Sequence, residues 1–162
     1  MTMRTKGFIS LGIMICSMFI LISCENEDDD EYGENEVKIS SYNDDDNHKN
    51  GQNCVSCHSS GGSGEGWFNV AGSVYDSSKQ NLYPNAVVKL YSEPNESGML
   101  IKQIEVDGKG NFYITESVDF GNGLYVSVTG TNGNSKVMNS PILTGQCNSC
   151  HGDSFENIWV GR

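Results

Sequence analysis

The residues with the clearest chemical potential form two copies of a Cys-x-x-Cys-His motif: Cys54-Val-Ser-Cys57-His58 and Cys147-Asn-Ser-Cys150-His151. Two thiols spaced by two residues can each form a thioether to one vinyl group of the same porphyrin. The histidine that follows directly is then carried beneath the iron as its proximal ligand. The sequence therefore predicts two covalent haems c on the four cysteines, with His58 and His151 as iron ligands.

Other chemistries use the same cysteine pairs. Two Cys-x-x-Cys pairs also have good spacing for one structural zinc ion, which would suit a small exported domain. Disulfides would fit an oxidising compartment, and a thioredoxin-like redox pair is a further alternative. Zinc and disulfides leave both motif histidines without a role, and the alternating strands and helices of a thioredoxin-like fold are missing from the pattern. Haem attachment explains every motif residue, and a surface binding or adhesion lipoprotein stapled by a four-cysteine zinc site is the alternative.

Few side chains are available for the sixth position of each iron. Apart from the motif histidines, the chain has one histidine, His48, and beyond its N-terminal apolar segment it has two methionines, Met99 and Met138. A second histidine ligand would favour a low potential, whereas methionine would raise it. These three residues are the candidate distal ligands. Each also has a structural alternative: His48 as a solvated residue, Met99 as a loop residue and Met138 as strand packing.

No residue pattern indicates catalysis that makes or breaks bonds. The chain lacks a Ser-His-Asp order, paired carboxylates in an apolar setting and a phosphate loop. The net charge is −11, and no basic patch offsets phosphate repulsion, which argues against nucleic acid as a partner. We expect an electron carrier rather than an enzyme, with other cytochromes or redox proteins of the cell envelope as its partners.

The N-terminal segment 1–23 is predicted to be a targeting signal. Arg4 and Lys6 precede an apolar run from Phe8 to Ile22, which is short for a membrane-spanning helix. The ending Leu21-Ile22-Ser23-Cys24 resembles the lipobox of bacterial lipoproteins. That resemblance implies cleavage before Cys24 and lipidation of its thiol, which would anchor the protein to a lipid membrane. A plain signal peptide or an uncleaved anchor is the alternative.

Segment 24–53 is predicted to be a disordered acidic tether. Residues 25–53 contain eleven acidic residues and two lysines, with few apolar residues to offset the entropy of ordering. An acidic run placed directly after the lipidated cysteine also resembles the surface-export signal of some Gram-negative lipoproteins. This implies an outer-membrane anchor with the protein facing outward, and a periplasm-facing spacer is the alternative. A calcium site at Asp44–Asp46 is disfavoured because the alternating ligand spacing of a calcium loop is missing.

The remaining segment, 54–162, must hold both motifs in place, and its pattern predicts an all-β domain. Short runs rich in Val, Ile, Tyr and Phe alternate with turn-forming residues, and no convincing helical periodicity occurs. Asp107–Asn111 is predicted to form a tight turn. The predicted strands are Phe68–Tyr75, Ala86–Tyr91, Leu100–Val106, Phe112–Thr115, Leu124–Val128, Ser135–Asn139 and Asn157–Val160.

Four segments of this domain resemble one family in order: Val70–Asp76, Pro84–Leu90, Val106–Phe112 and Tyr125–Val128. They look like the carboxypeptidase-regulatory-like, transthyretin-like family. The resemblance implies a seven-stranded Greek-key sandwich that serves as a scaffold or spacer, and it implies little about function. This chain departs from the family pattern by carrying a Cys-x-x-Cys-His motif on each side of the module, so function is expected at the motifs.

The strand order also predicts where the motifs lie. In an antiparallel sandwich, chain reversals alternate between two ends. Counting strands from the first motif places both motifs in loops at one end of the sandwich. The loop of Met99 is expected at that end, with Met138 close to it. Proximity of this kind would suit exchange of an electron between two haems, and a shared zinc ion would need it as well.

Overall fold

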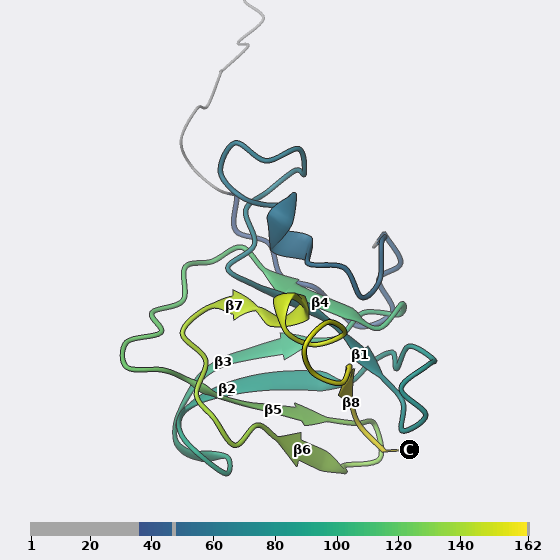
Figure 1. Ribbon diagram of the computed structural model, residues 1–162, viewed down its shortest axis with the longest axis vertical. Coiled ribbons are helices and arrows are strands. Elements are labelled where there is room, and N and C mark those ends of the chain that lie inside the picture. Colours follow the sequence, from purple (N-terminus) through teal and green to yellow (C-terminus); the bar gives the residue numbers. More distant parts are fainter. Residues whose placement is uncertain (1–35, 47, 162) are drawn as a thin grey trace, which may run out of the picture. The chain divides into compact units, whose positions relative to one another are not determined.

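Two β-sheets dominate the computed structural model, which describes residues 36–46 and 48–161 (Figure 1). All of these residues belong to one compact unit, Gly33–Arg162. The helical turns in the described part of the chain are two short 3₁₀ helices, η1 (Cys54–Ser56) and η2 (Cys147–Ser149). The strands are β1 (Val70–Tyr75), β2 (Val87–Glu93), β3 (Ser97–Glu105), β4 (Asn111–Ile114), β5 (Tyr125–Thr129), β6 (Ser135–Val137), β7 (Gly145–Gln146) and β8 (Ile158–Trp159).

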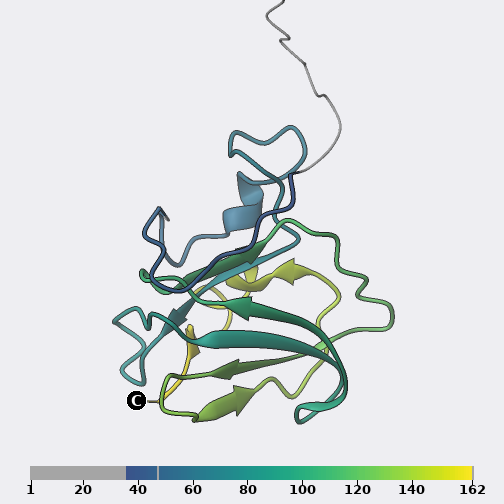
Figure 2. The ribbon, with the colours of Figure 1, turned by 180° about the vertical axis from the view of Figure 1, so that it is seen from behind.

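Each sheet has four strands, and the first sheet is built around β1. Strand β4 pairs antiparallel with one edge of β1, while the short strands β7 and β8 pair parallel with its other edge. The second sheet has the order β3-β2-β5-β6 and is antiparallel throughout, as can be followed in Figure 2. The predicted all-β sandwich is therefore confirmed. None of the helices that the structure describes is both long and apolar enough to cross a membrane.

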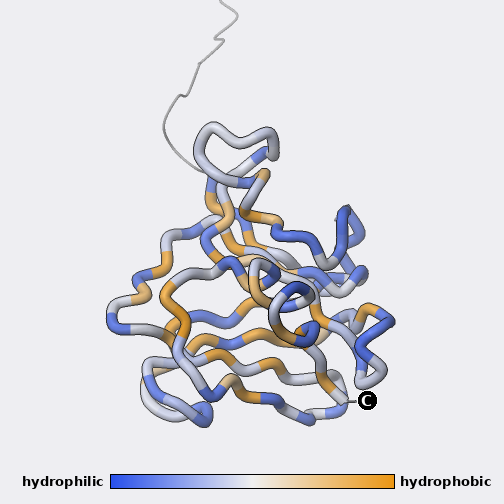
Figure 3. Tube along the Cα trace, in the orientation of Figure 1, coloured by the Kyte–Doolittle hydropathy of each residue, from blue (hydrophilic) through white to orange (hydrophobic). Residues whose placement is uncertain are grey.

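The hydrophobic core lies between the two sheets, and the apolar stretches along the strands can be followed in Figure 3. In β2, Val88 and Leu90 are buried while Lys89 and Tyr91 are only partly so, which is the period-two pattern of a strand with one inner face. Burial of each such aliphatic side chain contributes about 1.5–3 kcal/mol. The core consists of Val70, Val74, Tyr83, Ala86, Val88, Leu90, Ile104, Val106, Phe112, Ile114, Val118, Leu124, Val128 and Val160.

The predicted turn between β3 and β4 is confirmed. The backbone N–H of Asp107 donates to the carbonyl of Asn111 at 2.8 Å, and Gly110 has a φ of +81°. A side chain at Gly110 would also collide with Leu82, because an added Cβ would lie 2.9 Å from the Leu82 Cβ. Glycine is therefore required here for both its backbone conformation and its lack of volume.

All seven predicted strands are present, with ends that shift by up to three residues. The strand that the sequence pattern did not reveal is β7, which contains only Gly145 and Gln146 and therefore offers no apolar alternation to detect. It follows that the chain leaves β6 in the second sheet and returns to the first sheet before the second motif begins.

The chain just before the first motif packs against the first sheet. Ser40 is buried, its N–H donates to the Tyr113 carbonyl at 3.0 Å, and its hydroxyl donates to the Glu105 carbonyl at 2.5 Å. Ile39 forms an antiparallel bridge with Ile114 at the edge of β4. Residues 36–46 and 48–53 thus differ from the disordered tether expected over 24–53, because backbone and hydroxyl hydrogen bonds hold them where apolar burial does not. The predicted signal 1–23 and the lipidation site Cys24 lie outside the described residues.

Candidate functional site

Both motifs adopt the same local structure. Each begins with one 3₁₀ turn, after which the motif histidine donates its backbone N–H to the carbonyl of the first cysteine, at 3.0 Å in both motifs. The serine before the second cysteine donates to the carbonyl of the residue before the motif, at 2.7 Å from Ser56 and 2.6 Å from Ser149. Two segments 93 residues apart in the sequence are therefore folded alike, as expected for two sites that hold the same kind of group.

Each motif histidine has one ring nitrogen engaged by the backbone. The Nδ1 of His58 lies 2.8 Å from the Glu65 carbonyl, and the Nδ1 of His151 lies 2.6 Å from the Glu156 carbonyl. A carbonyl accepts only from a protonated nitrogen, so Nδ1 carries a proton in this geometry, and in the neutral ring Nε2 is the nitrogen that can bind a metal. Metal-binding histidines in proteins commonly have this backbone partner, which fixes the tautomer and the ring orientation.

The ring of His58 is also held by packing. It stacks on Phe68 with centroids 4.0 Å apart and an interplanar angle of 5°, and Phe68 in turn stacks on Tyr113. Gly64 lies against the same ring, since an added Cβ would come within 2.8 Å of its Cγ and Nδ1 atoms. The glycine-rich stretch after the first motif therefore makes room for the imidazole.

The two thiols of each motif differ in environment. The first cysteine of each pair is partly buried, whereas Cys57 and Cys150 are exposed, and all four thiols are free. Burial raises the pKa of the Cys54 thiol, and it raises the pKa of the Cys147 thiol to about 12. At neutral pH the inner sulfurs are therefore protonated, while the outer sulfurs face solvent.

A buried polar network joins the two motifs across β1. The Ser73 hydroxyl accepts hydrogen bonds from the Gly51 N–H at 2.9 Å and from the Asn148 amide at 3.2 Å, and it donates to Asn111 at 2.6 Å. The Asn148 amide also donates to the Gln52 carbonyl at 3.0 Å, which links the second motif directly to the chain that enters the first. The predicted proximity of the two motifs is confirmed.

Their location differs from the loops at one end of the sandwich that we expected. Strand β7 pairs with Val70 and Ala71, and β8 pairs with Val74 and Tyr75, so the second motif lies beside the middle of β1. The first motif is held at the same level by the hydrogen bond between Gly51 and Ser73. Strand counting failed here because β7 brings the chain back along β1 before the second motif, in place of a loop at a strand end.

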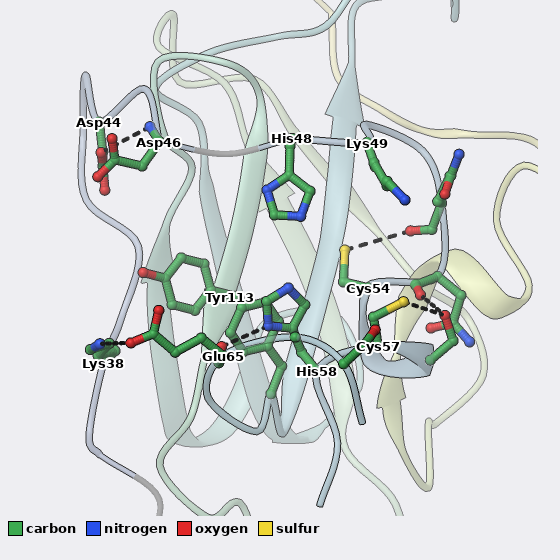
Figure 4. Close-up of a pocket in the computed structure, with 16 residues that line it drawn as sticks. Lys38, Asp44, Asp46, His48, Lys49, Cys54, Cys57, His58, Glu65 and Tyr113 are labelled. Atoms are coloured by element: carbon green, nitrogen blue, oxygen red, sulfur yellow. Dashed lines mark hydrogen bonds and ion pairs between the residues drawn. The ribbon is translucent and has the colours of Figure 1, made fainter. Parts of the chain in front are cut away.

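The first motif opens on a cavity of about 520 Å³ on the outer side of the first sheet. In Figure 4 the rings of His48 and His58 lie one above the other in this cavity, with Cys54 and Cys57 to one side. The ring centroids of the two histidines are 5.9 Å apart. Its wall includes five charged side chains: Lys38, Asp44, Asp46, Lys49 and Glu65.

The second motif opens on a separate cavity of about 690 Å³. It is bounded by the β7–η2–β8 edge of the first sheet and by β5 and β6 of the second, and it reaches the core residues Val88 and Phe112. Met138 and Trp159 belong to its wall. The Lys136 ammonium lies 4.0 Å from the ring centroid of Trp159. Both cavities fall within the range of about 300–1,000 Å³ that is usual for cofactor sites.

The three candidate distal ligands have different positions. His48 lines the first cavity and Met138 lines the second, each in the same cavity as a motif histidine. Met99 lies in β3, is 68% exposed, and belongs to the wall of neither cavity. Two of the three candidates are therefore brought to a motif.

The four motif cysteines do not form one cluster. Among the described residues, the one group of three or more His, Cys, Asp or Glu side chains with ligand atoms close enough to share an ion is Asp44, Asp45 and Asp46. Those carboxylates lie at the surface, where acidic clusters commonly occur without an ion. A zinc ion shared by the four cysteines would therefore require the motifs to move relative to one another.

The residues of each cavity fit a covalently attached haem. Two thiols, one imidazole with a free Nε2 and a cavity of suitable volume occur together at both motifs. Comparisons with protein-family models, with curated proteins and with solved structures each find no match. The resemblance to the transthyretin-like family thus stays a prediction, and the arguments on function depend on the geometry of the site.

Sequence reasoning missed the residues that support the motifs. Ser73, Asn111 and Asn148 hold both segments against β1, and the carbonyls of Glu65 and Glu156 orient the two imidazoles. The polar residues at alternate positions of β1 and β4 were the available signal, because Ser73 and Asn111 face away from the core at paired positions.

Proposed function

We propose that this protein is an exported dihaem c-type cytochrome, anchored by lipid, that carries single electrons between redox partners of the cell envelope. One observation carries the proposal: each Cys-x-x-Cys-His motif opens on its own cavity, with the Nε2 of its histidine free and its Nδ1 held by a carbonyl. The outer-membrane location, with the protein facing the surface, is part of the proposal and is supported by the lipobox at Cys24 and the acidic run after it.

Each part of a motif has a separate task in this proposal. Cys54 and Cys57 would hold one haem, and Cys147 and Cys150 the other. Each haem supplies, when bound, an iron that alternates between the ferrous and ferric states. His58 and His151 present Nε2 as the proximal ligand, and the carbonyls of Glu65 and Glu156 make that nitrogen more basic by accepting the Nδ1 proton.

In this proposal the β-sandwich holds the two motifs in place and supplies no reactive group itself. Pairing of β7 and β8 with β1, and the hydrogen bonds of Ser73, bring both motifs to one strand. Two redox centres held on the same rigid strand would keep a fixed separation. An electron carrier benefits from that arrangement because the protein around each centre need not rearrange when an electron arrives.

The test is the haem content of the mature protein. Protein exported from a cell that matures c-type cytochromes should gain the mass of two haems and give a pyridine haemochrome spectrum of haem c. Cys57→Ala and Cys150→Ala should each lower the haem number by one and leave the other haem in place. Val55→Ala, inside the first motif, is the control and should keep two.

Two results would contradict the proposal. A colourless wild-type protein that contains one zinc ion would replace it with the zinc-stapled alternative. Loss of every bound cofactor from a single cysteine substitution would do the same, because one shared structural ion contributes directly to folding.

A further inference from the structure

The two cavities differ in the side chains that could bind iron opposite their motif histidines. The inference drawn from this difference rests on the proposed function, since it concerns the sixth ligands of the two haems. We propose that His48 is the distal ligand of the haem at the first motif, that Met138 is the distal ligand of the haem at the second, and that the second haem consequently has the higher reduction potential.

The position of His48 fits an iron shared with His58. A bond between a transition metal and an imidazole nitrogen is about 2 Å long. Two imidazoles that bind one metal from opposite sides would therefore have ring centroids about 6 Å apart, once the distance from each nitrogen to its ring centroid is added. The observed separation is 5.9 Å, with the rings tilted by 39°. Figure 4 shows the two rings facing each other in the cavity, with the motif cysteines beside the space between them.

The chain around His48 is held on both sides. Before it, the Asp44 carbonyl accepts the Gly108 N–H at 2.8 Å. After it, the Asn50 side chain accepts from the Asn111 amide at 2.6 Å, and the Gly51 N–H donates to Ser73. These contacts place His48 over the first motif, so the acidic segment serves as the distal wall of this site.

Met138 occupies the corresponding place in the second cavity. It follows β6 directly, is partly buried, and its N–H donates to the Val126 carbonyl at 2.8 Å. This extends the pairing between β5 and β6 by one step and puts Met138 on the wall that β5 and β6 provide, in the cavity of His151. Apart from the motif residues themselves, the thioether is the one side chain in that wall, among the described residues, that commonly serves as a distal iron ligand.

Ligand type and surroundings act on the two potentials in the same direction. Methionine opposite histidine raises the potential of a haem relative to two histidines. Apolar walls disfavour the extra charge of the ferric state, and the second cavity is lined mainly by apolar residues, with Lys136 and Glu156 as its charged side chains of opposite sign. The first cavity contains three carboxylates (Asp44, Asp46 and Glu65) and two ammonium groups, which together favour the ferric state. The first electron added from an external donor should therefore reduce the second iron.

The test is an optical redox titration of the holoprotein, with haem number checked first by intact mass. The wild type should give two separate one-electron waves and the near-infrared charge-transfer band of a methionine–iron bond. Met138→Ala should abolish that band and lower the upper wave only. His48→Ala should convert one haem from low spin to high spin and change the lower wave only, and added imidazole should restore the low-spin spectrum. Met99→Ala, a methionine outside both cavities, should match the wild type.

The outcomes separate this inference from the proposed function. A protein with two haems whose spectrum and waves are unchanged by both His48→Ala and Met138→Ala overturns the ligand assignment and leaves the dihaem carrier standing. Loss of the methionine band in Met99→Ala, or an upper wave that follows His48→Ala, also overturns it. A wild-type protein without haem overturns both. Imidazole rescue distinguishes loss of a ligand from loss of the fold, because a misfolded site would not recover.

Discussion

At the scale of single residues, the two motifs agree in geometry but differ in constraint. His58 is fixed by the Glu65 carbonyl, by a stacked Phe68 and by the close approach of Gly64. His151 has the Glu156 carbonyl at 2.6 Å, while its aromatic neighbour Phe155 is tilted, with centroids 6.3 Å apart. The first imidazole is thus positioned by hydrogen bonding and packing together, and the second mainly by hydrogen bonding.

The difference between inner and outer thiols predicts an order of alkylation. In reduced chain without haem at pH 8, Cys57 and Cys150 should react with iodoacetamide first, and Cys147 at least about tenfold more slowly than Cys150. The reason is that burial raises the pKa of the Cys147 thiol to about 12, so little of it is thiolate until the pH approaches that value. Mass spectrometry of peptides from a time course measures the rates.

Two controls accompany this experiment. In urea the four rates should converge, because unfolding removes the burial that raises the pKa. Raising the pH towards 12 should speed the reaction of Cys147, because a larger share of this thiol is then ionised. If Cys147 reacts as fast as Cys150 in the folded chain at pH 8, the second motif is not packed against the core.

At the scale of elements, β1 is the strand on which the site depends. Its inner face supplies Val70 and Val74 to the core, and its outer face supplies Ser73 to the network that holds both motifs. Because both faces of β1 are covered, five of its six residues are buried. The strand has the core on one side and the entry to the first motif on the other.

Ser73→Ala should destabilise the domain by about 1–3 kcal/mol, because it removes the Ser73 donor to the buried Asn111 Oδ1 and one of the acceptors of the buried Asn148 amide. Ser127→Ala is the matched control. Ser127 is equally buried, in β5, but its hydroxyl has no hydrogen-bond partner within the described part of the chain. Removing it should be neutral or slightly stabilising. Urea denaturation of both variants measures the two effects, which are read as changes in stability when the m-value is unchanged. Equal losses in both variants would mean that the network does not support the motifs.

At the scale of the whole described molecule, the two cavities lie on opposite sides of the first sheet. Tyr113 belongs to the wall of the first cavity and Phe112 to that of the second, and these adjacent residues of β4 point to opposite faces. One haem would therefore lie outside the sheet, beneath the acidic segment, and the other at the open side of the sandwich. Partners could approach the two centres from different directions.

The proposed lipid anchor is tested by Cys24→Ala. This variant should leave the membrane fraction, or remain unprocessed, because the thiol that would carry the lipid is absent. The released or unprocessed protein should keep both haems, since the motifs begin thirty residues later, at Cys54. Fractionation, together with labelling by a radioactive fatty acid, measures the effect. Cys16→Ala, within the predicted signal, is the control and should remain anchored. Continued lipid labelling of Cys24→Ala would contradict the assignment.

The sequence by itself determined the strands and the residues that attach the cofactor in the proposed function. Alternation of apolar and polar residues reflects which face of a strand is buried, so β2 and β4 could be predicted within a few residues. The Cys-x-x-Cys-His spacing is equally local, because both thiols and the imidazole must reach one porphyrin from a single turn of chain. The acidic stretch could only be interpreted as a tether, since its contacts depend on backbone hydrogen bonds that composition does not reveal.

Only the tertiary structure decided which distant residues meet. His48 and His58 are ten residues apart in the sequence, but their distance depends on hydrogen bonds from Gly108, Asn111 and Ser73. Met138 and Met99 were equivalent candidates in the sequence. In the structure only Met138 lines a cavity, because β6 borders the second cavity whereas Met99 lies exposed on β3. The position of the second motif was set by β7, a strand of two residues that is stabilised by its pairing with β1 rather than by any pattern of its own. Contacts of this kind depend on pairing between segments that are distant in the sequence, so a local sequence pattern cannot predict them.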